Sequence, residues 1–326
     1  MKLHLDKDRF KEAILITAQE KGILPIYIEK DYWVTYVLWL IFTDAELSKY
    51  TIFKGGTALS KCYDLIERFS EDIDLTVLVE PTDNDNTLKK KIRTISKKVE
   101  VELKEMQVDG ITHKRGNIRK TVHLYPIIEK ANFGQVRDKV IVEASWLGNF
   151  EPFQSYQIGS FITEMLYQKE LEEWLSCYNL ERFSVNVLDI RRTFCEKIMS
   201  LVRFSFSSNS IEDLKMKIRH IYDIHKLLEL AEIQDFLKSD EFEVMILKVG
   251  RDDVDSYKND NSWLANHPKE AILFKKIEET WSSIRLNYLV DFKRLVYGDL
   301  PSESSILSSL LLIKERLNKV DWNLSK

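Results

Sequence analysis

The stretch from Ile52 to Val79, IFKGGTALSKCYDLIERFSEDIDLTVLV, constrains this chain most, because it joins a glycine turn to a strand that begins with two acids. Asp72 and Asp74 are two residues apart at the head of a β-branched run. Side chains alternate between the two faces of a strand, so both carboxylates project from the same face. Two like charges held together in this way require either a cation or exposure to water.

Two interpretations of this acid pair are open. A divalent metal ion such as Mg²⁺ prefers carboxylate and phosphate oxygens, and it removes the repulsion that would otherwise raise the pKa of one carboxyl group. Alternatively, both acids lie in water at a strand end, which is the commoner fate of an isolated Asp-x-Asp pair. The pair by itself does not decide between a metal site and a solvated strand end.

The glycine turn upstream favours a phosphate site. Gly55, Gly56 and Thr57 follow a short apolar piece and precede a helix start at residues 58–61. Paired glycines let backbone N–H groups approach a phosphate closely, and the N-terminus of the following helix adds partial positive charge. Thr57 either caps this helix or contacts a phosphate; the alternative for the glycines is an ordinary tight turn. Cations near the turn come from Lys54, Lys61 and Arg68.

A glycine turn followed shortly by an Asp-x-Asp strand is more specific than either part alone. The combination resembles the signature of the nucleotidyltransferase superfamily, in which a glycine-containing turn precedes a metal-binding acid pair. KGGTALSK followed by RFSEDIDL is similar to the AbiEii/AbiGii toxin family of abortive-infection nucleotidyltransferases. The resemblance covers about residues 29–228. It implies an α+β fold, with a nucleotidyltransferase-like mixed sheet flanked by helices and followed by an all-helical C-terminal domain.

Three further segments resemble elements of this family. The first is EKDY at residues 29–32, in which we expect Lys30 and Asp31 to form a structural ion pair; contact with a ligand is the alternative. The second is TFCEK at residues 193–197, where Cys195 replaces a common aromatic residue. The third is RHIYDI at residues 219–224, a motif that faces the nucleotide site in relatives. For Arg219 and Asp223 the alternative is a local ion pair beside a buried histidine.

A third acid completes the site that the resemblance implies. Glu143 lies in the apolar strand pattern KVIVEAS at residues 139–145, and superfamily catalysis uses a third carboxylate from a neighbouring strand. A single acid in a strand is otherwise a solvent-facing residue. The implied catalytic residues are Asp72, Asp74, Glu143 and Lys197, of which the three acids are the metal ligands. The implied nucleotide-binding residues are Lys54, Gly55, Gly56, Thr57, Ser60, Lys61, Arg68, Ser70, Arg219 and Asp223. The expected cofactor is Mg²⁺ or Mn²⁺, with a nucleoside triphosphate as substrate.

Composition limits the class of protein and its location. The 326 residues, 44% of them hydrophobic, suffice for a large core. The net charge of −4 and the pI of about 6.0 exclude a general polyanion binder, so contact with nucleic acid requires local patches. The three cysteines have no zinc-type spacing and fit a reducing cytoplasm. The N-terminus has no apolar signal core, and the apolar segment 32–42 is too short to span a bilayer, so we expect a cytoplasmic protein without membrane contact.

Periodicity predicts the remaining elements. We expect helices at about residues 6–20, after Ile28, and from about residue 85 to about residue 107, and a hairpin over residues 111–128 that turns at Gly116-Asn117. Around residues 148–160 the periodicity is lost, and the chain beyond is almost entirely helical. The predicted domains are therefore an α/β domain with N-terminal helices at residues 1–155 and a helical domain at residues 156–326 that contributes to the cleft for nucleotide and acceptor.

The third of these helices carries a basic face, for which two interpretations are open. Its charged residues are Lys89, Lys90, Lys91, Arg93, Lys97, Lys98 and Lys104. A basic face of this kind either follows an RNA backbone or is simply a solvated helix surface, and the second is the more common.

The activity that these parts support is nucleotidyl transfer, and the family resemblance implies a growth-inhibiting bacterial toxin with a cognate antitoxin. The leading acceptor is the 3′ end of tRNA, and a hydroxyl group of a protein or a small molecule is the runner-up. Two other classes remain: a noncatalytic nucleotide-binding or RNA-binding module, and an interaction protein whose partner is the antitoxin. Loss of toxicity in Asp72→Asn distinguishes the enzyme from the interaction protein.

Overall fold

The computed structural model describes residues 1–128, 138–148, 150–257 and 260–324. Contacts between residues divide the chain into two compact units. The first unit comprises residues 1–64, 69–146 and 153–188, and the second comprises residues 65–68, 147–152 and 189–326. The boundary expected from the sequence, between residues 155 and 156, falls inside a strand of the first unit, Phe153–Ile158.

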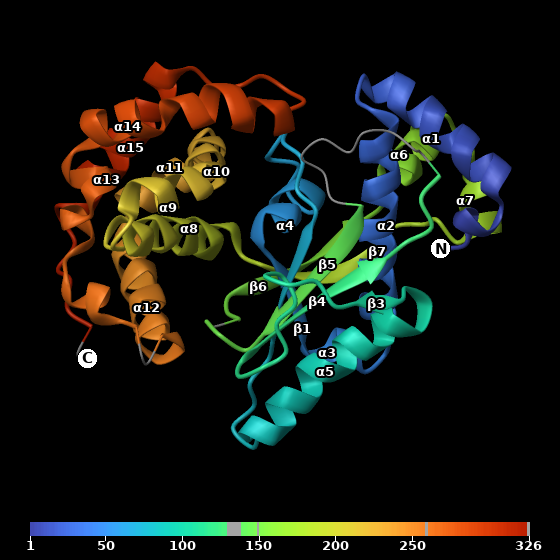
Figure 1. Ribbon diagram of the computed structural model, residues 1–326, viewed down its shortest axis with the longest axis horizontal. Helices are drawn as coiled ribbons and strands as arrows, with labels where there is room; N and C mark the ends of the chain where they lie inside the picture. The colour runs from blue at the N-terminus through green and yellow to red at the C-terminus, as the bar shows by residue number, and fades with distance from the viewer. Residues whose placement is uncertain (129–137, 149, 258–259, 325–326) are drawn as a thin grey trace. The chain divides into compact units, whose positions relative to one another are not determined.

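A seven-stranded mixed sheet forms the centre of the first unit (Figure 1). Its strands in spatial order are β3 (Glu105–Met106), β4 (Ile118–Leu124), β5 (Lys139–Ser145), β2 (Asp72–Val77), β1 (Thr51–Lys54), β7 (Phe183–Leu188) and β6 (Phe153–Ile158). The pairs β2–β5 and β1–β7 are parallel, and the other neighbours are antiparallel. The sheet confirms the predicted α+β class with a mixed sheet.

The first unit contains helices before and between the strands of the sheet. They are α1 (Lys7–Lys21), α2 (Pro25–Phe42), α3 (Leu47–Tyr50), α4 (Gly55–Lys61), α5 (Asp85–Glu102), α6 (Phe161–Gln168) and α7 (Glu172–Tyr178). The expectation that the second helix begins after Ile28 is wrong, because α2 starts at Pro25. Proline is tolerated at the first helical position, where its missing N–H would have no partner in the helix.

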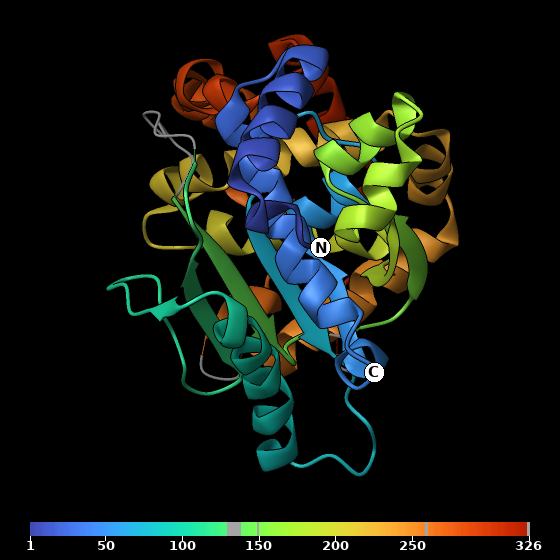
Figure 2. The same ribbon diagram turned by 90° about the vertical axis from the view of Figure 1, so that its right-hand side faces the viewer.

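One face of the sheet is covered by α2 and α5, as Figure 2 shows. The apolar stripe of α5, from Leu88 to Val99, is buried in one core with the alternate strand residues Ile73, Leu75 and Val77. Because side chains alternate along β2, the acids at its head point to the opposite face. Helix α5 ends at Glu102, earlier than expected, because the next residues form β3.

The predicted hairpin over residues 111–128 is wrong in its first arm. Residues 111–117 form no strand, and only an isolated bridge joins His113 to Lys120. The second arm is β4, which pairs with β5 along its whole length and with the short β3. Strand β5 pairs with one edge of β4, and the other edge carries β3 and the bridge at His113, so the predicted arm contributes one residue pair in place of a strand.

Strands β6 and β7 were not predicted from the sequence. An irregular segment was expected at β6, and no element was expected at β7. Strand β6 is the edge of the sheet, and most of its residues are exposed, so it shows no apolar alternation. Strand β7 is short, but it brings Val185, Val187 and Leu188 into the core beside β1. An exposed edge strand gives little signal because only its partner strand defines its pairing.

The second unit is helical, as expected. Its helices are α8 (Ile190–Ser205), α9 (Ser210–Met216), α10 (Ile218–Leu228), α11 (Ala231–Lys238), α12 (Asp240–Ser256), α13 (Ile272–Lys275), α14 (Ile277–Leu286) and α15 (Glu303–Leu317), with π and 3₁₀ turns at Asn287–Asp291 and Phe292–Leu295. The Asp189 side chain accepts a hydrogen bond from the Arg191 N–H and so caps α8. Within the described ranges, no helix is both long and apolar enough to cross a bilayer.

Candidate active site

The register of the sheet brings the three predicted acids together. Asp72 and Asp74 lie on one face at the start of β2, and Asp74 is directly opposite Glu143 on the parallel strand β5. Side chains of directly paired residues project to the same face, with Cβ atoms about 4.5–5.5 Å apart. The acids therefore form a cluster on the sheet face that α5 does not cover.

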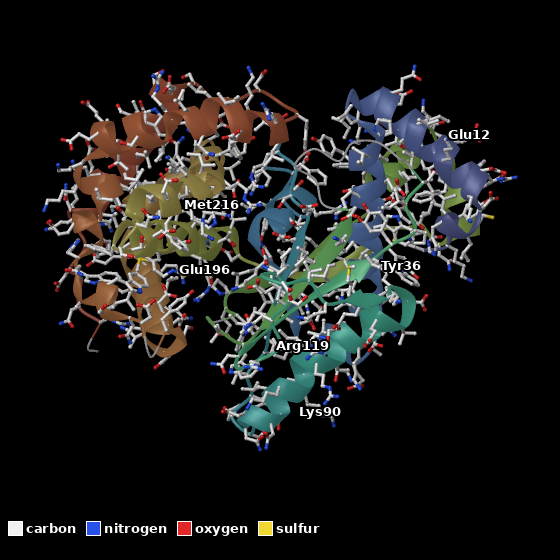
Figure 3. The ribbon with its side chains drawn as sticks, viewed as in Figure 1. Glu12, Tyr36, Lys90, Arg119, Glu196 and Met216 are labelled. Carbon is white, nitrogen blue, oxygen red and sulfur yellow. The ribbon has the colours of Figure 1, made fainter. Side chains whose placement is uncertain are left out.

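Two lysines flank these acids in the same row of the sheet. Lys54, the last residue of β1, is opposite Asp74, and Lys120 of β4 is opposite Glu143. The Lys120 Nζ donates a hydrogen bond to the Glu143 Oε2 at 2.8 Å. Arg119, labelled in Figure 3, lies on the other face, where its Nε donates to the Ser96 hydroxyl of α5. Lys120 was not predicted from the sequence, since only the pairing of β4 with β5 places it beside Glu143.

The environment of Asp74 disfavours its charged form. Burial raises its pKa first, and the negative charges of Glu143 and Asp72 raise it further, whereas Lys54 and Lys120 lower it. The result is a rise in the pKa of Asp74 from 3.8 to about 7. The protonated form of Asp74 is thus favoured by its burial and by the two neighbouring carboxylates.

This shift predicts how metal-free stability depends on pH. A carboxyl group whose pKa is raised on folding binds more protons in the folded state, so its contribution to stability falls as pH rises from about 4 to about 7. We expect the thermal midpoint in EDTA to fall by a few degrees between pH 5 and pH 8, and less in Asp74→Asn. Thermal unfolding at several pH values measures this; an equal fall in both proteins contradicts it.

Gly55 provides space for Asp74. Its backbone has φ +82°, a conformation that residues with a side chain rarely adopt, and a Cβ atom there would lie 2.3 Å from the Asp74 Oδ2. Gly55 is also the first residue of α4, directly after β1. Glycine is therefore required at position 55 for two reasons. The backbone has a positive φ there, and the Asp74 carboxylate lies where a Cβ atom would be.

The hydroxyl groups near the turn make contacts within the protein. Thr57 is buried, and its Oγ1 donates to the Asp72 carbonyl at 2.6 Å and lies 2.9 Å from the Ser70 Oγ. Thr57 is therefore a link between α4 and the head of β2. Ser60 is half-buried in α4, one turn further along. Their predicted contacts with a nucleotide stay predictions.

Lys61 and the charged residues of the EKDY segment form buried ion pairs around the sheet. The Lys61 Nζ pairs with the Asp31 carboxylate and donates to the Gly159 carbonyl at 3.1 Å. Lys30 pairs with Glu71, the residue before the acid strand, at 3.2 Å. Lys30 and Asp31 thus form structural ion pairs, as expected, although not with each other. The predicted role of Lys61 in nucleotide binding stays a prediction.

The basic face of α5 is only partly neutralised. Lys91 pairs with Asp83 at 2.5 Å, and Lys98 pairs with Asp44 at 2.8 Å. The exposed basic residues of the same helix are Lys89, Lys90, Arg93 and Lys97. Lys90 is labelled in Figure 3. This helix covers the sheet face opposite to the acids. Both interpretations of its basic residues stay predictions.

In the second unit, a buried ion network joins Arg68, Lys197 and Asp223. The Arg68 guanidinium binds both carboxylate oxygens of Asp223, at 2.6 and 2.7 Å, and the Lys197 Nζ lies 2.8 Å from the Asp223 Oδ2. Burial alone would raise the pKa of Asp223, but the two cations hold it well below its usual range. The network brings together three residues that were predicted separately as site residues from the sequence.

The local ion pair considered for Arg219 and Asp223 is absent. The Asp223 carboxylate binds Arg68 and Lys197 instead, and no ion pair of Arg219 is found among the residues that the structure describes. Burial and the charges of Lys197 and Lys217 hold the pKa of the neighbouring His220 well below its usual value, so this imidazole is neutral at pH 7. The bidentate geometry of Arg68 on Asp223 is among the strong charge-assisted contacts.

Comparison with known families decides which family these features represent. A family model described as "Nucleotidyl transferase AbiEii toxin, Type IV TA system" matches residues 38–308. The chain belongs to the AbiEii nucleotidyltransferase toxin family. The matched range includes the three acids, the glycine turn and the Arg68–Lys197–Asp223 network. This AbiEii-family protein is thus a nucleotidyltransferase of a toxin–antitoxin family, as the sequence motifs predicted.

A solved structure similar to this AbiEii-family chain is MenT4, a nucleotidyltransferase toxin from Mycobacterium tuberculosis H37Rv. The match covers 92% of this chain and 98% of MenT4, with 15% sequence identity and a TM-score of 0.45. No curated protein matches the chain.

The donor atoms on the acid face of this AbiEii-family protein fit a divalent cation. Asp72, Asp74 and Glu143 offer carboxylate oxygens, the ligands that Mg²⁺ and Mn²⁺ prefer, and the raised pKa of Asp74 reflects its burial beside two like charges. As these side chains stand, no group of three or more His, Cys, Asp or Glu residues is arranged to hold a metal among the described residues. The Lys120 ammonium is the cation that contacts Glu143.

Proposed function

We propose that this protein transfers a nucleoside monophosphate from a nucleoside triphosphate to an acceptor hydroxyl in a metal-dependent reaction, with the 3′ end of tRNA as the acceptor. The observation that carries this proposal is the row Lys54–Asp74–Glu143–Lys120 beside the Gly55 turn. Such a row places carboxylate ligands next to backbone N–H groups that a triphosphate can reach.

The acids have defined roles in this reaction. Asp72, Asp74 and Glu143 would hold Mg²⁺ or Mn²⁺, which supplies charge neutralisation for the triphosphate. Glu143 accepts the proton of the acceptor hydroxyl. The acceptor oxygen forms a bond to the α-phosphorus while the bond from that phosphorus to the bridging oxygen breaks, and pyrophosphate leaves.

The turn orients the phosphates. The backbone N–H groups of Gly55 and Gly56 lie at the N-terminus of α4. Lys54 adds positive charge beside Asp74. The roles predicted for Lys197, Arg219 and Asp223 toward the nucleotide concern the second unit and stay predictions. A cognate antitoxin as partner is part of the proposal and is supported by the description of the family as a toxin–antitoxin system. Action in the bacterial cytoplasm is also proposed.

Gly55→Ala is expected to lower nucleotidyl transfer by about 100-fold, because the new methyl group displaces the Asp74 carboxylate and misplacement of a catalytic group by about 1 Å has this effect. The positive φ of Gly55 adds a loss of stability of about 1–2 kcal/mol. Transfer rate and urea unfolding measure the two effects.

Gly22→Ala is the matched control for this substitution. Gly22 also has a positive φ, +65°, but no atom lies within 4 Å of its Cβ position. It should therefore show the stability loss without the loss of transfer. Equal transfer rates in the two variants would contradict the displacement of Asp74.

The function is tested by incubating the purified protein with Mg²⁺, bulk tRNA and each α-labelled nucleoside triphosphate in turn. Asp72→Asn/Asp74→Asn is the inactive control, and Asp109→Asn, an exposed acid of the same unit, is the matched control. Label on tRNA that depends on the acids supports the proposal and identifies the base. Label on protein or on a small molecule supports the runner-up acceptor, and no transfer to any acceptor supports a noncatalytic binding module.

A further inference from the structure

The acid cluster has a second component, a lysine to which nothing so far assigns a function. Lys120 ends the cross-strand row in which cations occupy the two outer positions and carboxylates the two inner ones. The pairing of β4 with β5 continues over seven residue pairs, from Ile118 to Leu124, so the register at Lys120 is firmly held. The backbone, and not side-chain flexibility, places this lysine beside Glu143.

The contact is specific in its geometry. The Lys120 Nζ lies 2.8 Å from the Glu143 Oε2, and the two side chains are 30% and 33% exposed. The preceding residue, Arg119, is anchored on the opposite face by its bond to Ser96, which fixes the alternation of β4. A partly exposed ion pair of this kind is stable enough to form and weak enough for one partner to be replaced by another cation.

The ion pair occupies one of the carboxylates that a divalent cation needs. A metal ion at Asp72, Asp74 and Glu143 must compete with the ammonium group for Glu143 and overcome its positive charge. We propose that Lys120 is a positioning residue that holds Glu143 on the acid face and supplies positive charge there until a divalent cation binds and displaces it. This inference rests on the proposed metal-dependent function.

An ordinary surface salt bridge makes a different prediction. Such a pair contributes about 0–1 kcal/mol to stability. It affects metal affinity only through the electrostatic effect of the lysine charge. The two explanations differ in what happens when Lys120 is removed. Displacement predicts tighter metal binding that depends on Glu143, together with a less stable metal-free protein.

The test is calorimetric titration of the metal-free full chain with Mg²⁺, and with Mn²⁺ as a second probe, for wild type, Lys120→Met and Lys120→Arg. We expect Lys120→Met to bind the cation about 3–10-fold more tightly, since it no longer breaks an ion pair, and to have a lower thermal midpoint in EDTA. Lys120→Arg keeps the pair and should resemble wild type. Lys89→Met, at an exposed lysine of α5, is the matched control and should change neither value.

A double-mutant cycle with Glu143→Gln separates displacement from simple loss of charge. In the Glu143→Gln background, Lys120→Met should give no further gain in affinity. A gain that persists there, or equal affinities of wild type and Lys120→Met, overturns the role of Lys120 while leaving metal dependence intact. Absence of cation binding by the wild type overturns both this inference and the metal-dependent function.

Discussion

Asp74→Asn is expected to abolish nucleotidyl transfer, by at least about 10³-fold, while the metal-free protein stays as stable as wild type or becomes more stable at pH 8. Asparagine fills the same space but carries no charge, so it relieves the repulsion from Glu143 and Asp72 that raises the pKa of Asp74. It also removes a metal ligand. Opposite changes in activity and stability are the signature of a functional cluster of like charges.

The measurements are the initial rate of label transfer and the urea midpoint in EDTA at pH 8. Asp109→Asn should leave both unchanged, because Asp109 is exposed and outside the cluster. An Asp74→Asn protein that retains transfer within about tenfold of wild type, or that unfolds at a clearly lower urea concentration, is incompatible with this account.

Asp223→Ala is expected to destabilise the protein by about 3–5 kcal/mol, because it leaves the Arg68 guanidinium and the Lys197 ammonium buried without a counter-charge. The side chains of Asp223, Arg68 and Lys197 are 0%, 3% and 7% exposed, so water cannot replace the carboxylate. The shift of the urea unfolding midpoint measures this loss.

The same network predicts sensitivity to acid. The pKa of Asp223 is depressed on folding, so its stabilisation is complete above the unfolded pKa of about 3.9 and is lost as pH falls below about 4 toward the folded pKa. Asp223→Ala should therefore show a weaker decline in stability below pH 4 than wild type. Chemical unfolding between pH 2.5 and pH 6 tests the difference.

Two controls separate the network from general effects of substitution. Asp235→Ala, at an exposed acid of the second unit, should change stability by less than about 0.5 kcal/mol. The triple variant Arg68→Met, Lys197→Met, Asp223→Leu removes all three charges and should recover much of the loss. If Asp223→Ala is as stable as Asp235→Ala, the buried carboxylate is not the centre of this network.

Patterns local to the chain predicted much of the fold. The period of two placed Asp72 and Asp74 on one face of a strand, and the apolar run around Glu143 predicted β5 with its observed bounds. A turn at Gly55-Gly56-Thr57 was predicted between a strand and a helix, and these residues form the first turn of α4, directly after β1. These predictions succeeded because each depends on neighbouring residues only.

Predictions that required pairing between distant segments failed or were not made. The hairpin arm at residues 111–117 was wrong because β3, which lies before this arm in the chain, pairs with the edge of β4 that does not face β5, and only a bridge at His113 remains of the arm. Strand β6 was missed because an edge strand with exposed side chains has no apolar period, and β7, which lies inside the sheet between β1 and β6, was not predicted. The local ion pair of Arg219 with Asp223 is replaced by a pair with Arg68.

The sequence by itself determined the chemical inventory of this protein: an acid pair on one strand face, a glycine turn before it, a third acid in an apolar strand, and membership of the AbiEii family. Only the tertiary structure decided which charges meet. It placed Lys120 on Glu143 and joined Arg68 and Lys197 at Asp223. The physical reason is that periodicity records which face a residue occupies, whereas the partner of a buried charge depends on sheet register and helix packing between distant segments.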